Sequence, residues 1–374
     1  MATYDVIVAG LGAAGSASAS HLAGLGQRVL GLDRFSPPHA LGSSHGGTRI
    51  IREAYFEGSA YVPLVRRAYE LWHELERESG ETLLAQTGGI TIGTPGGALF
   101  QGALTSAMEH AIPHETLSSA ELARRYPDLR PDDDMSGILE TRAGVLFPEA
   151  CIAALLGQAR ARGSVVQAGE PVLDWSATSS GVTVQTPRET YSAGTLVLAA
   201  GPWLPELLGE DGPSLWVERQ VMHWFGSRER PGGVRTRAPI TLWEYEPDRV
   251  LYTIPDFGSG TKAAFHHAGE PSQADDVRRS VDQAEIAAIE QIVGRHMPGL
   301  IPKVQRSATC MYTNTPDQHF LIDRHSEHPN VIIVSACSGH GFKFAPAVGE
   351  IVAGLVAGSS DGPPALFARR APMS

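Results

Sequence analysis

The sequence contains few cysteines. Only three occur among its 374 residues, Cys151, Cys310 and Cys337, and no two of them form a C-x-x-C pair. An odd number without such pairs argues against a disulfide framework and against a cysteine zinc site. We therefore expect a reducing compartment, the cytoplasm, and no metal centre.

Long apolar runs and clusters of positive charge are also absent. No apolar segment approaches the roughly 18 residues that a membrane-spanning helix needs, and the start, MATYDVIVAGLGAAG, has no basic residue before its apolar stretch. Basic residues number 30 against 41 acidic ones, giving a net charge of −11, and they form no run. We expect neither export nor membrane insertion, and no nucleic-acid partner.

What the chain does have is enough length for more than one core. Its 374 residues, 42% of them apolar and 19% charged, are typical of a globular protein. Domains usually contain roughly 100–200 residues, so the length predicts about two of them. No internal repeat or low-complexity stretch interrupts the chain.

The first forty residues predict a dinucleotide-binding unit. Residues 5–9 form a short β-rich run, glycines follow at 10, 12 and 15, an Ala/Ser-rich helical pattern continues to residue 25, and a second apolar run covers 28–32. This is the strand, turn, helix, strand order of such folds.

Each glycine of this unit has a separate physical task. Gly10 permits the tight turn, Gly12 lets the backbone approach a pyrophosphate, and Gly15 lets helix and strand pack closely, while the helix N-terminus faces the phosphates. Asp33 ends the second strand, where a carboxylate accepts hydrogen bonds from an adenosine ribose. The motif alone leaves NAD and FAD both open.

The next segment carries a family resemblance. Residues 37–72, PPHALGSSHGGTRIIREAYFEGSAYVPLVRRAYELW, resemble the monomeric sarcosine oxidase and N-methyltryptophan oxidase family of amine-oxidising flavoenzymes. Three later blocks agree with that family in the same order: LVLAAGPW at 196–203, CMYTNTPDQHFLID at 310–323 and SGHGFKFAPAVGE at 338–350. The resemblance therefore covers most of the chain and implies FAD rather than NAD.

The resemblance gives Cys310 a role. In this family the flavin is attached through a thioether between its 8α methyl carbon and a cysteine in a block similar to ATCMYTNTPD, so Cys310 is the expected attachment point. Without the family, a lone cysteine is usually a small buried apolar residue. We keep that interpretation for Cys151 and Cys337.

Two cations are expected to bind the substrate carboxylate. The resemblance implies that Arg52 and Lys343 do so, a pairing suited to charge-assisted hydrogen bonds, and that Arg49 lies over the flavin edge. The three-residue spacing of Arg49 and Arg52 predicts that both project from one face of a helical turn. Taken without the family, they are two solvated surface arginines.

A second group of candidates lies in GSGTKAAFHHAGE, residues 258–270. In an extended segment Lys262 and His266 share a face, because side chains alternate with period two. By resemblance, Lys262 activates oxygen, since a cation beside the flavin stabilises developing negative charge. His266 is expected near the substrate amine with His267 facing away, and Tyr312 is expected to reach toward the same pocket.

Further cofactor contacts are expected along the chain. The backbone of CSGHGFKF, including Lys343, and a helix beginning near Pro346 are expected to face the flavin pyrimidine edge, where negative charge collects on reduction. The other expected contacts are Arg34, Ser43, Thr48, Val172, Gly201 and Gly341.

The positions of these motifs predict an α/β protein with a Rossmann-like FAD-binding domain and a second domain built on a mostly antiparallel sheet. The FAD-binding domain is expected to be discontinuous, comprising residues 1–85, 146–214 and 309–374. Residues 86–145 and 215–308 are expected to form the substrate domain, with the active site between the two layers.

Three positions depart from the family pattern. Gly47 stands where aspartate is common, Phe56 where glycine is common, and Leu251 where sarcosine-selective members have an aromatic residue. These departures leave the cofactor assignment intact but leave the substrate open, because pocket walls distinguish one amine from another.

The leading expectation is a monomeric FAD-dependent oxidase of secondary amino acids. It converts an N-methyl amino acid, dioxygen and water into the amino acid, formaldehyde and hydrogen peroxide. Three alternatives stay open: a cyclic imino acid oxidase acting on proline or pipecolate, a flavin dehydrogenase or demethylase that uses another electron acceptor, and a non-catalytic dinucleotide-binding sensor.

Overall fold

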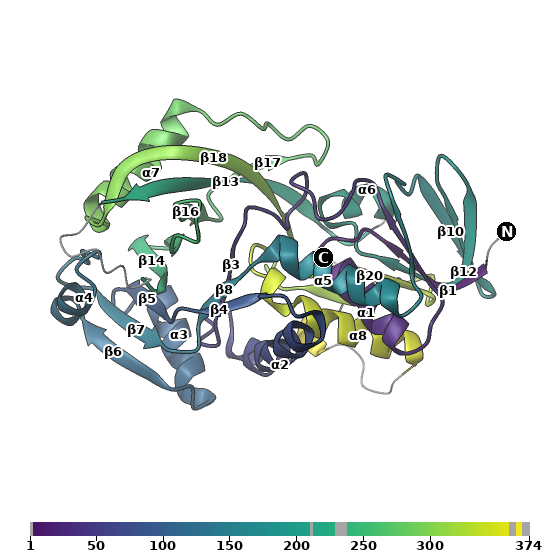
Figure 1. The fold of residues 1–374 in the computed structure, drawn as a ribbon, viewed down its shortest axis with the longest axis horizontal. Helices are drawn as coiled ribbons and strands as arrows, with labels where there is room; N and C mark the ends of the chain where they lie inside the picture. Colours follow the sequence, from purple (N-terminus) through teal and green to yellow (C-terminus); the bar gives the residue numbers. More distant parts are fainter. Residues whose placement is uncertain (1–2, 210–211, 229–237, 359–363, 369–374) are drawn as a thin grey trace.

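The computed structural model describes residues 3–209, 212–228, 238–358 and 364–368. Figure 1 shows two parts that lie side by side, each built around one large sheet. A small three-stranded sheet and helix α2 lie where the two parts meet.

The first part begins as the sequence predicted. Strand β1 (Thr3–Ala9), helix α1 (Ala13–Gly24) and strand β2 (Val29–Asp33) follow one another, and the two strands pair in parallel. Gly10 has a φ of 90°, and a Cβ there would lie 2.6 Å from the carbonyl oxygen of Ala199, so the turn after β1 requires glycine. A Cβ on Gly15 would lie 1.8 Å from the carbonyl oxygen of Gly10, which explains the close packing of α1.

This unit belongs to an eight-stranded sheet. The strand order is β10-β11-β12-β1-β2-β9, with β20 paired to β12 and β19 paired to β20. The bounds of the added strands are β9 (Val165–Ala168), β10 (Asp174–Thr178), β11 (Gly181–Gln185), β12 (Thr190–Leu198), β19 (Leu321–Arg324) and β20 (Val331–Ser335).

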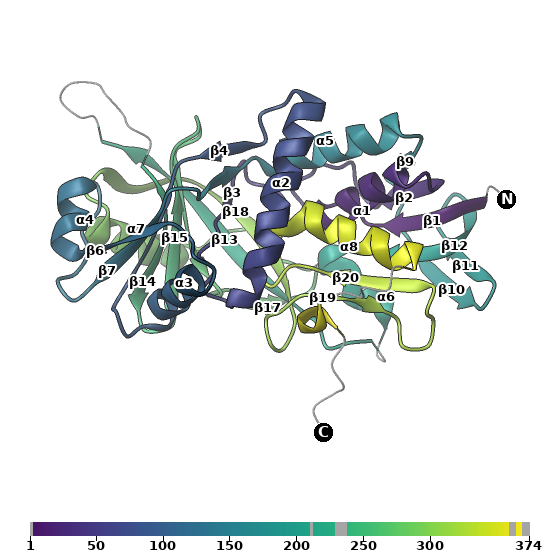
Figure 2. The ribbon, with the colours of Figure 1, turned by 90° about the horizontal axis from the view of Figure 1, so that it is seen from below.

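Both faces of β1 are buried, as expected for a central parallel strand. Val6 and Val8 belong to one core with residues of helices α1, α2 (Val62–Ser79), α5 (Pro148–Ala161) and α8 (Ala345–Ala357), which lie together in Figure 2. Ile7 and Ala9 point to the opposite face, because side chains alternate along a strand, and join a second core.

The second part is a nine-stranded sheet in the order β17-β13-β16-β15-β14-β5-β7-β6, with β18 also paired to β13. Its one parallel pair among the described strands is β14 with β5, so the predicted mostly antiparallel sheet is confirmed. The bounds are β5 (Gly89–Gly93), β6 (His114–Ser118), β7 (Ser136–Glu140), β13 (Trp216–Ser227), β14 (Ile240–Glu246), β15 (Arg249–Ile254), β16 (Thr261–His266), β17 (Glu270–Ser272) and β18 (Leu300–Asn314).

Helix α7 (Gln283–His296) covers one face of this sheet. Its Ile289 and Val293 share a core with Phe225 and Trp243 of the strands. Shorter elements complete the fold: α3 (Ala98–Glu109), α4 (Ser119–Arg125), α6 (Leu204–Leu208), and the 3₁₀ turns η1 (Ser59–Tyr61), η2 (Gly201–Trp203), η3 (Phe342–Phe344) and η4 (Ala365–Phe367).

The small sheet corrects one prediction. It consists of β3 (Arg49–Ile51), β8 (Gly144–Leu146) and β4 (Leu84–Gln86). Arg49 begins β3 and Arg52 follows its end, so the predicted helical turn is wrong: pairing of β3 with β8 keeps the segment extended.

The predicted fold class is confirmed, and within the described residues no helix is both long and apolar enough to cross a membrane. The predicted domain boundaries stay a prediction. Strand β18 runs without a break through the proposed boundary at residue 309.

Candidate functional site

A cavity of about 480 Å³ is lined by residues from both large sheets. It contains every predicted site residue except Gly15, which lies behind it in the packing of α1 on β1. The predicted residues that line it are Gly10, Gly12, Asp33, Arg34, Ser43, Thr48, Arg49, Arg52, Val172, Gly201, Lys262, His266, Cys310, Tyr312, Gly341 and Lys343.

One end of the cavity is formed by the start of α1. Gly12 precedes the helix without a side-chain cap, and the first turn carries no acidic residue. A Cβ on Gly12 would meet no atom closer than Ser44 Oγ at 3.8 Å, so no side chain covers this surface. The uncapped N–H groups of a helix N-terminus attract an anion such as a pyrophosphate.

Asp33 is already partly engaged beside this helix end. Its carboxylate accepts hydrogen bonds from the backbone N–H of Leu11 at 2.7 Å and of Phe35 at 2.8 Å. Each carboxylate oxygen has a second lone pair, so a ribose hydroxyl can still donate to it. Arg34 is paired with Asp275 at 2.9 Å, which holds its guanidinium at the rim.

The thiol of Cys310 lies deep in the cavity beside a cation. Cys310 is 3% exposed, and its Sγ lies 3.7 Å from Nη2 of Arg49 and 3.4 Å from the carbonyl oxygen of Ser43. Arg49 also donates to the carbonyl oxygens of Ser43 at 2.6 Å and Thr48 at 2.9 Å. The loop at 43–48 therefore holds the guanidinium against the thiol.

Lys262 approaches the same loop from β16. It is 1% exposed, and its Nζ donates to the carbonyl oxygens of Thr48 and, at 3.3 Å, Gly46. Burial, together with the charge of Arg49, lowers the pKa of Lys262 well below its usual value. The two cations share the Thr48 carbonyl as an acceptor.

His266 and Tyr312 form a neutral pair on the cavity wall, with 3.4 Å between Nδ1 and Oη. Burial lowers the pKa of His266 well below its usual value, and adjacent His267 lowers it further. Burial raises the pKa of Tyr312 well above its usual value. Lys262 and His266 both line the cavity, as predicted, whereas His267 is turned toward Glu218, 3.1 Å away.

Arg52 occupies the other end of the cavity and is itself ion-paired. Its Nη2 lies 2.5 Å from Oε2 of Glu57, its Nη1 donates to the carbonyl oxygen of Ala54 at 2.8 Å, and its guanidinium lies 4.4 Å from the centre of the Tyr55 ring. Burial raises the pKa of Glu57, but the charges of Arg52 and Lys343, with His340, outweigh it and hold the value at about 2.

Lys343 completes this group from turn η3. Its Nζ donates to the carbonyl oxygen of His340 at 2.6 Å and to the hydroxyl of Tyr55 at 3.3 Å. Burial and the nearby charge of Arg52 lower the pKa of Lys343 to about 7, although Glu57 opposes this. The predicted carboxylate-binding cations are thus brought together, with a carboxylate of the chain already beside them.

Comparison with known proteins identifies the family. Residues 5–355 match the family described as FAD dependent oxidoreductase. The chain belongs to this family. This chain is 44% identical over 372 residues to a monomeric sarcosine oxidase of Streptomyces avermitilis, and the alignment covers 98% of this chain and 97% of that protein. It is 34% identical over 364 residues to N-methyl-L-tryptophan oxidase of Salmonella heidelberg, covering 96% and 95%.

A solved structure shows the same fold. NikD, described as an unusual amino acid oxidase essential for nikkomycin biosynthesis, superposes with a TM-score of 0.88 and covers 100% of this chain and 99% of its own. The identity is 24%, so this likeness concerns the fold of the oxidoreductase alone.

The cavity of this oxidoreductase fits FAD. Glycines and an uncapped helix end form one region, and the opposite region is lined by buried cations. Ser43 Oγ and Ser335 Oγ are buried on the cavity wall without a hydrogen-bond partner in the described structure. Buried hydroxyls normally find a partner, so these two are suited to a bound polar group.

Sequence reasoning missed Glu57, Tyr55, His340 and Gly339 of the oxidoreductase site. Glu57 stands in the family block at 37–72, five positions after Arg52, but that spacing alone predicts no contact. Gly339 leaves room for two predicted residues, because a Cβ there would lie 2.6 Å from Tyr312 Cε2 and 2.7 Å from His266 Cε1.

The three departures from the family pattern lie in different places. Phe56 packs on the site, 4.8 Å from its ring centre to the Arg52 guanidinium and 6.4 Å to the His266 ring. Leu251 is fully buried in the core under α7, so the expectation that it forms part of the pocket wall is wrong. The next residue, Tyr252, lines the cavity instead, because neighbouring side chains on β15 point to opposite faces of the sheet. Gly47 has a φ of 79°, and a Cβ there would meet no atom within 4 Å.

Proposed function

We propose that this FAD-dependent oxidoreductase is an oxidase of secondary amino acids, with N-methyl amino acids such as sarcosine as the leading substrates. The carbon–nitrogen bond of the substrate is oxidised to an imine, and dioxygen is reduced to hydrogen peroxide. Hydrolysis of an N-methyl imine then releases formaldehyde. The observation that carries the proposal is one cavity that holds two separate groups of cations. A buried arginine and lysine lie at one end, and a second buried lysine shares the Thr48 carbonyl with Arg49, the cation beside Cys310.

Arg52 and Lys343 bind the substrate carboxylate in this proposal. Both are at least 95% buried, so their charges act with little screening by water. Oε2 of Glu57 lies 2.5 Å from Nη2 of Arg52. The incoming substrate carboxylate must displace Glu57 from this position. An acid therefore binds by exchanging one carboxylate partner of the guanidinium for another.

His266 and Tyr312 contact the amine end of the substrate. Neutral His266 accepts or donates a hydrogen bond there without adding charge beside a cationic amine. When bound, FAD accepts a hydride equivalent from the carbon next to nitrogen and passes two electrons to dioxygen. Lys262 in its protonated form stabilises the negative charge that develops on oxygen, since its Nζ is desolvated and fixed by two carbonyl oxygens.

Cys310 is the proposed point of covalent attachment, through an 8α-S-cysteinyl thioether. Support comes from the position of the sulfur, which lies in the cavity lining 3.7 Å from the Arg49 guanidinium. Arg34, Ser43, Thr48, Val172, Gly201 and Gly341 are proposed cofactor contacts, since all line the cavity.

The wider organisation is part of the same proposal. The names of several relatives favour a monomer, as with the monomeric sarcosine oxidase of Streptomyces avermitilis. We retain the two-domain division with a discontinuous FAD-binding domain, and the cytoplasm, as proposals.

A substrate panel tests the function. Purified holoenzyme is mixed anaerobically with sarcosine, N-methyltryptophan, proline or pipecolate, and flavin bleaching is followed. We expect bleaching by at least one of them and stoichiometric hydrogen peroxide when air is admitted. Bleaching without peroxide would identify a dehydrogenase that uses another acceptor, and no bleaching by any secondary amine would refute the proposal.

A further inference from the structure

A large bulge interrupts the pairing of β13 with the segment that contains β16 and β17, next to the cavity. Ala263 of β16 faces His223 of β13, and Glu270 of β17 faces Arg219. The chain therefore takes seven steps from 263 to 270 where β13 takes four. Ala264 to His266 stay paired with β15, and residues 267–269 leave the sheet. Bulges re-aim side chains, and this one carries His266 at its start.

Glu218 of β13 fastens this bulge. The residue is 8% exposed, and its carboxylate accepts hydrogen bonds from the backbone N–H of Gly269 at 3.0 Å and from His267 Nδ1 at 3.1 Å. Gln220 at 2.6 Å and Asn314 at 2.8 Å also donate to it through their amides. Four donors from four positions of the chain thus converge on one buried carboxylate.

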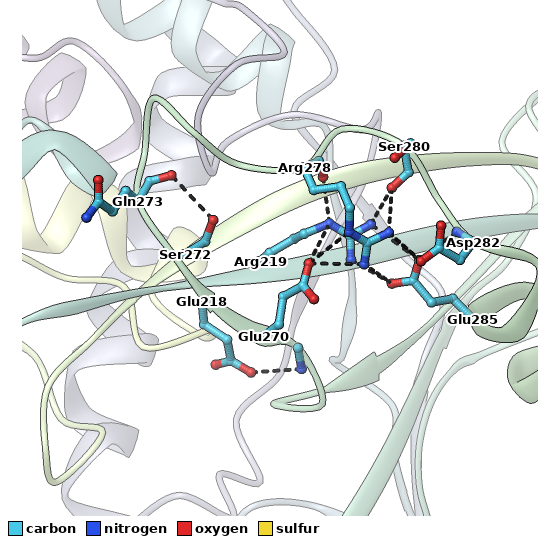
Figure 3. A network of polar contacts seen from close by, with 10 residues as sticks. Glu218, Arg219, Glu270, Ser272, Gln273, Arg278, Ser280, Asp282 and Glu285 are labelled. Carbon is cyan, nitrogen blue, oxygen red and sulfur yellow. Dashed lines mark hydrogen bonds and ion pairs between the residues drawn. The ribbon is translucent and has the colours of Figure 1, made fainter.

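Arg219 anchors the outer side of the same segment. Figure 3 shows the side chains of Glu218 and Arg219 leaving β13 in opposite directions. The Arg219 guanidinium binds Glu285 at 2.6 Å and the carbonyl oxygens of Arg278 at 2.6 Å and Ser280 at 2.7 Å. The loop that follows β17 is therefore fixed to α7, which leaves the bulge little freedom.

His267 has acceptors at both ring nitrogens. Nδ1 faces the Glu218 carboxylate, and Nε2 lies 3.2 Å from the carbonyl oxygen of Ser338. Neither acceptor can donate, so both bonds form only when both nitrogens carry a proton. The ring centre of His267 lies 4.3 Å from that of His266 and 5.3 Å from that of Tyr312.

We propose that His267 is a positioning residue, held between Glu218 and the Ser338 carbonyl with a proton on each ring nitrogen, and that it orients His266 toward Tyr312. This inference rests on the proposed function, in which His266 lies beside the substrate amine. It extends that function by assigning the orientation of His266 to a neighbour outside the cavity lining, whose charge adds to the effect of burial on the pKa of His266.

Other charged groups also act on His266. Glu57 favours its protonation, whereas His340 and Arg52 oppose it, and Tyr312 is the neutral partner of its Nδ1. Glu218 is the carboxylate that balances His267. Burial alone would raise the pKa of Glu218, but the hydrogen bond from His267 and its positive charge help to lower it. Replacing His267 or Glu218 changes this balance while leaving the cavity cations in place.

The test is histidine-selective ¹⁵N NMR of the holoenzyme, which reports protonation without substrate. At pH 7.5 we expect both ring nitrogens of His267 to carry protons. In Glu218→Gln, His267 should become singly protonated at that pH. One unprotonated nitrogen on wild-type His267 would overturn the assignment.

Substitutions of His267 separate the effect of its charge on His266 from the effect of the bulge geometry. His267 has a φ of 52°, which asparagine tolerates well, and an asparagine amide can still donate to Glu218. In His267→Asn we expect the titration midpoint of His266 to rise by about one pH unit, the size of a nearby like-charge effect. His267→Lys should retain the low titration midpoint of His266, because it keeps a positive charge at position 267. His73→Asn changes an exposed histidine and should leave the His266 midpoint unchanged.

An unchanged His266 midpoint in folded His267→Asn would refute the positioning role. The pH profile of anaerobic flavin bleaching should shift in the same direction as the NMR midpoint. If no amine bleaches the flavin, the proposed function fails while the NMR titration still decides the state of His267.

Discussion

The Arg52 guanidinium lies 2.5 Å from the Glu57 carboxylate at the end of the cavity predicted to bind an acid. The pair is almost fully enclosed, with side-chain exposures of 4% and 15%. An incoming carboxylate therefore meets an arginine that already has a partner. In the proposed function, substrate affinity depends on the exchange of these partners.

Removing that competitor should strengthen binding of acids. In Glu57→Gln we expect acetate, which lacks an amine, to bind about tenfold more tightly, on the order of 1.4 kcal/mol. The measurement is a titration of the flavin absorbance spectrum. Glu70→Gln, which alters an exposed partner of Arg67, is the control and should bind acetate as the wild type does. Equal affinities in Glu57→Gln and wild type would show that Glu57 does not compete.

Lys343 should make acid binding depend on pH. Its pKa of about 7 means that the ammonium is present below pH 7 and is lost above it. Acetate affinity should therefore fall as pH rises from 6 to 8. In Lys343→Met we expect weaker binding at pH 6 and no step near pH 7; a step that persists in the variant would assign it to another group.

Lys262 should act on the oxidative half-reaction. In Lys262→Met the reaction of reduced flavin with dioxygen should slow by roughly 10²–10³-fold, the size of a lost preorganised electrostatic contact. Anaerobic reduction by substrate should change far less. Stopped-flow absorbance measures both steps, with exposed Lys303→Met as the control. Equal slowing of both steps would indicate a role in binding instead.

Cys310 should retain the flavin after denaturation. Acid-precipitated protein should stay yellow, and Cys310→Ala should release its flavin into the supernatant. Cys337→Ala is a close control, since Cys337 also lines the cavity. A colourless wild-type pellet would refute the covalent attachment.

Gly339 should be intolerant of a side chain. Gly339→Ala places a Cβ 2.6 Å from Tyr312 at a φ of 76°, so we expect a loss of about 1–3 kcal/mol in the free energy of unfolding. Gly26 has a similar φ of 78°, but a Cβ there would meet no atom within 4 Å. Gly26→Ala therefore measures the cost of the backbone conformation without a steric contact. Denaturant unfolding of both variants measures the difference, and equal losses would mean that contact with Tyr312 contributes nothing.

The sequence by itself determined the dinucleotide unit and the alternation along β16. Glycine spacing and apolar runs are local properties of the backbone, so Gly10, Gly12 and Gly15 predicted the turn and helix that the structure contains. Likewise, the period of two on an extended segment places Lys262 and His266 on one face.

Tertiary structure alone decided the partners of the charged groups. Strand pairing made the Arg49 segment extended, where spacing had predicted a helical turn, and packing placed Leu251 in a core and Tyr252 in the cavity. The pairing of Arg52 with Glu57, and of His267 with Glu218, depends on distances between side chains that no sequence interval specifies. Local sequence patterns determine the backbone conformation, whereas burial and the convergence of distant segments determine which charged side chains pair with each other.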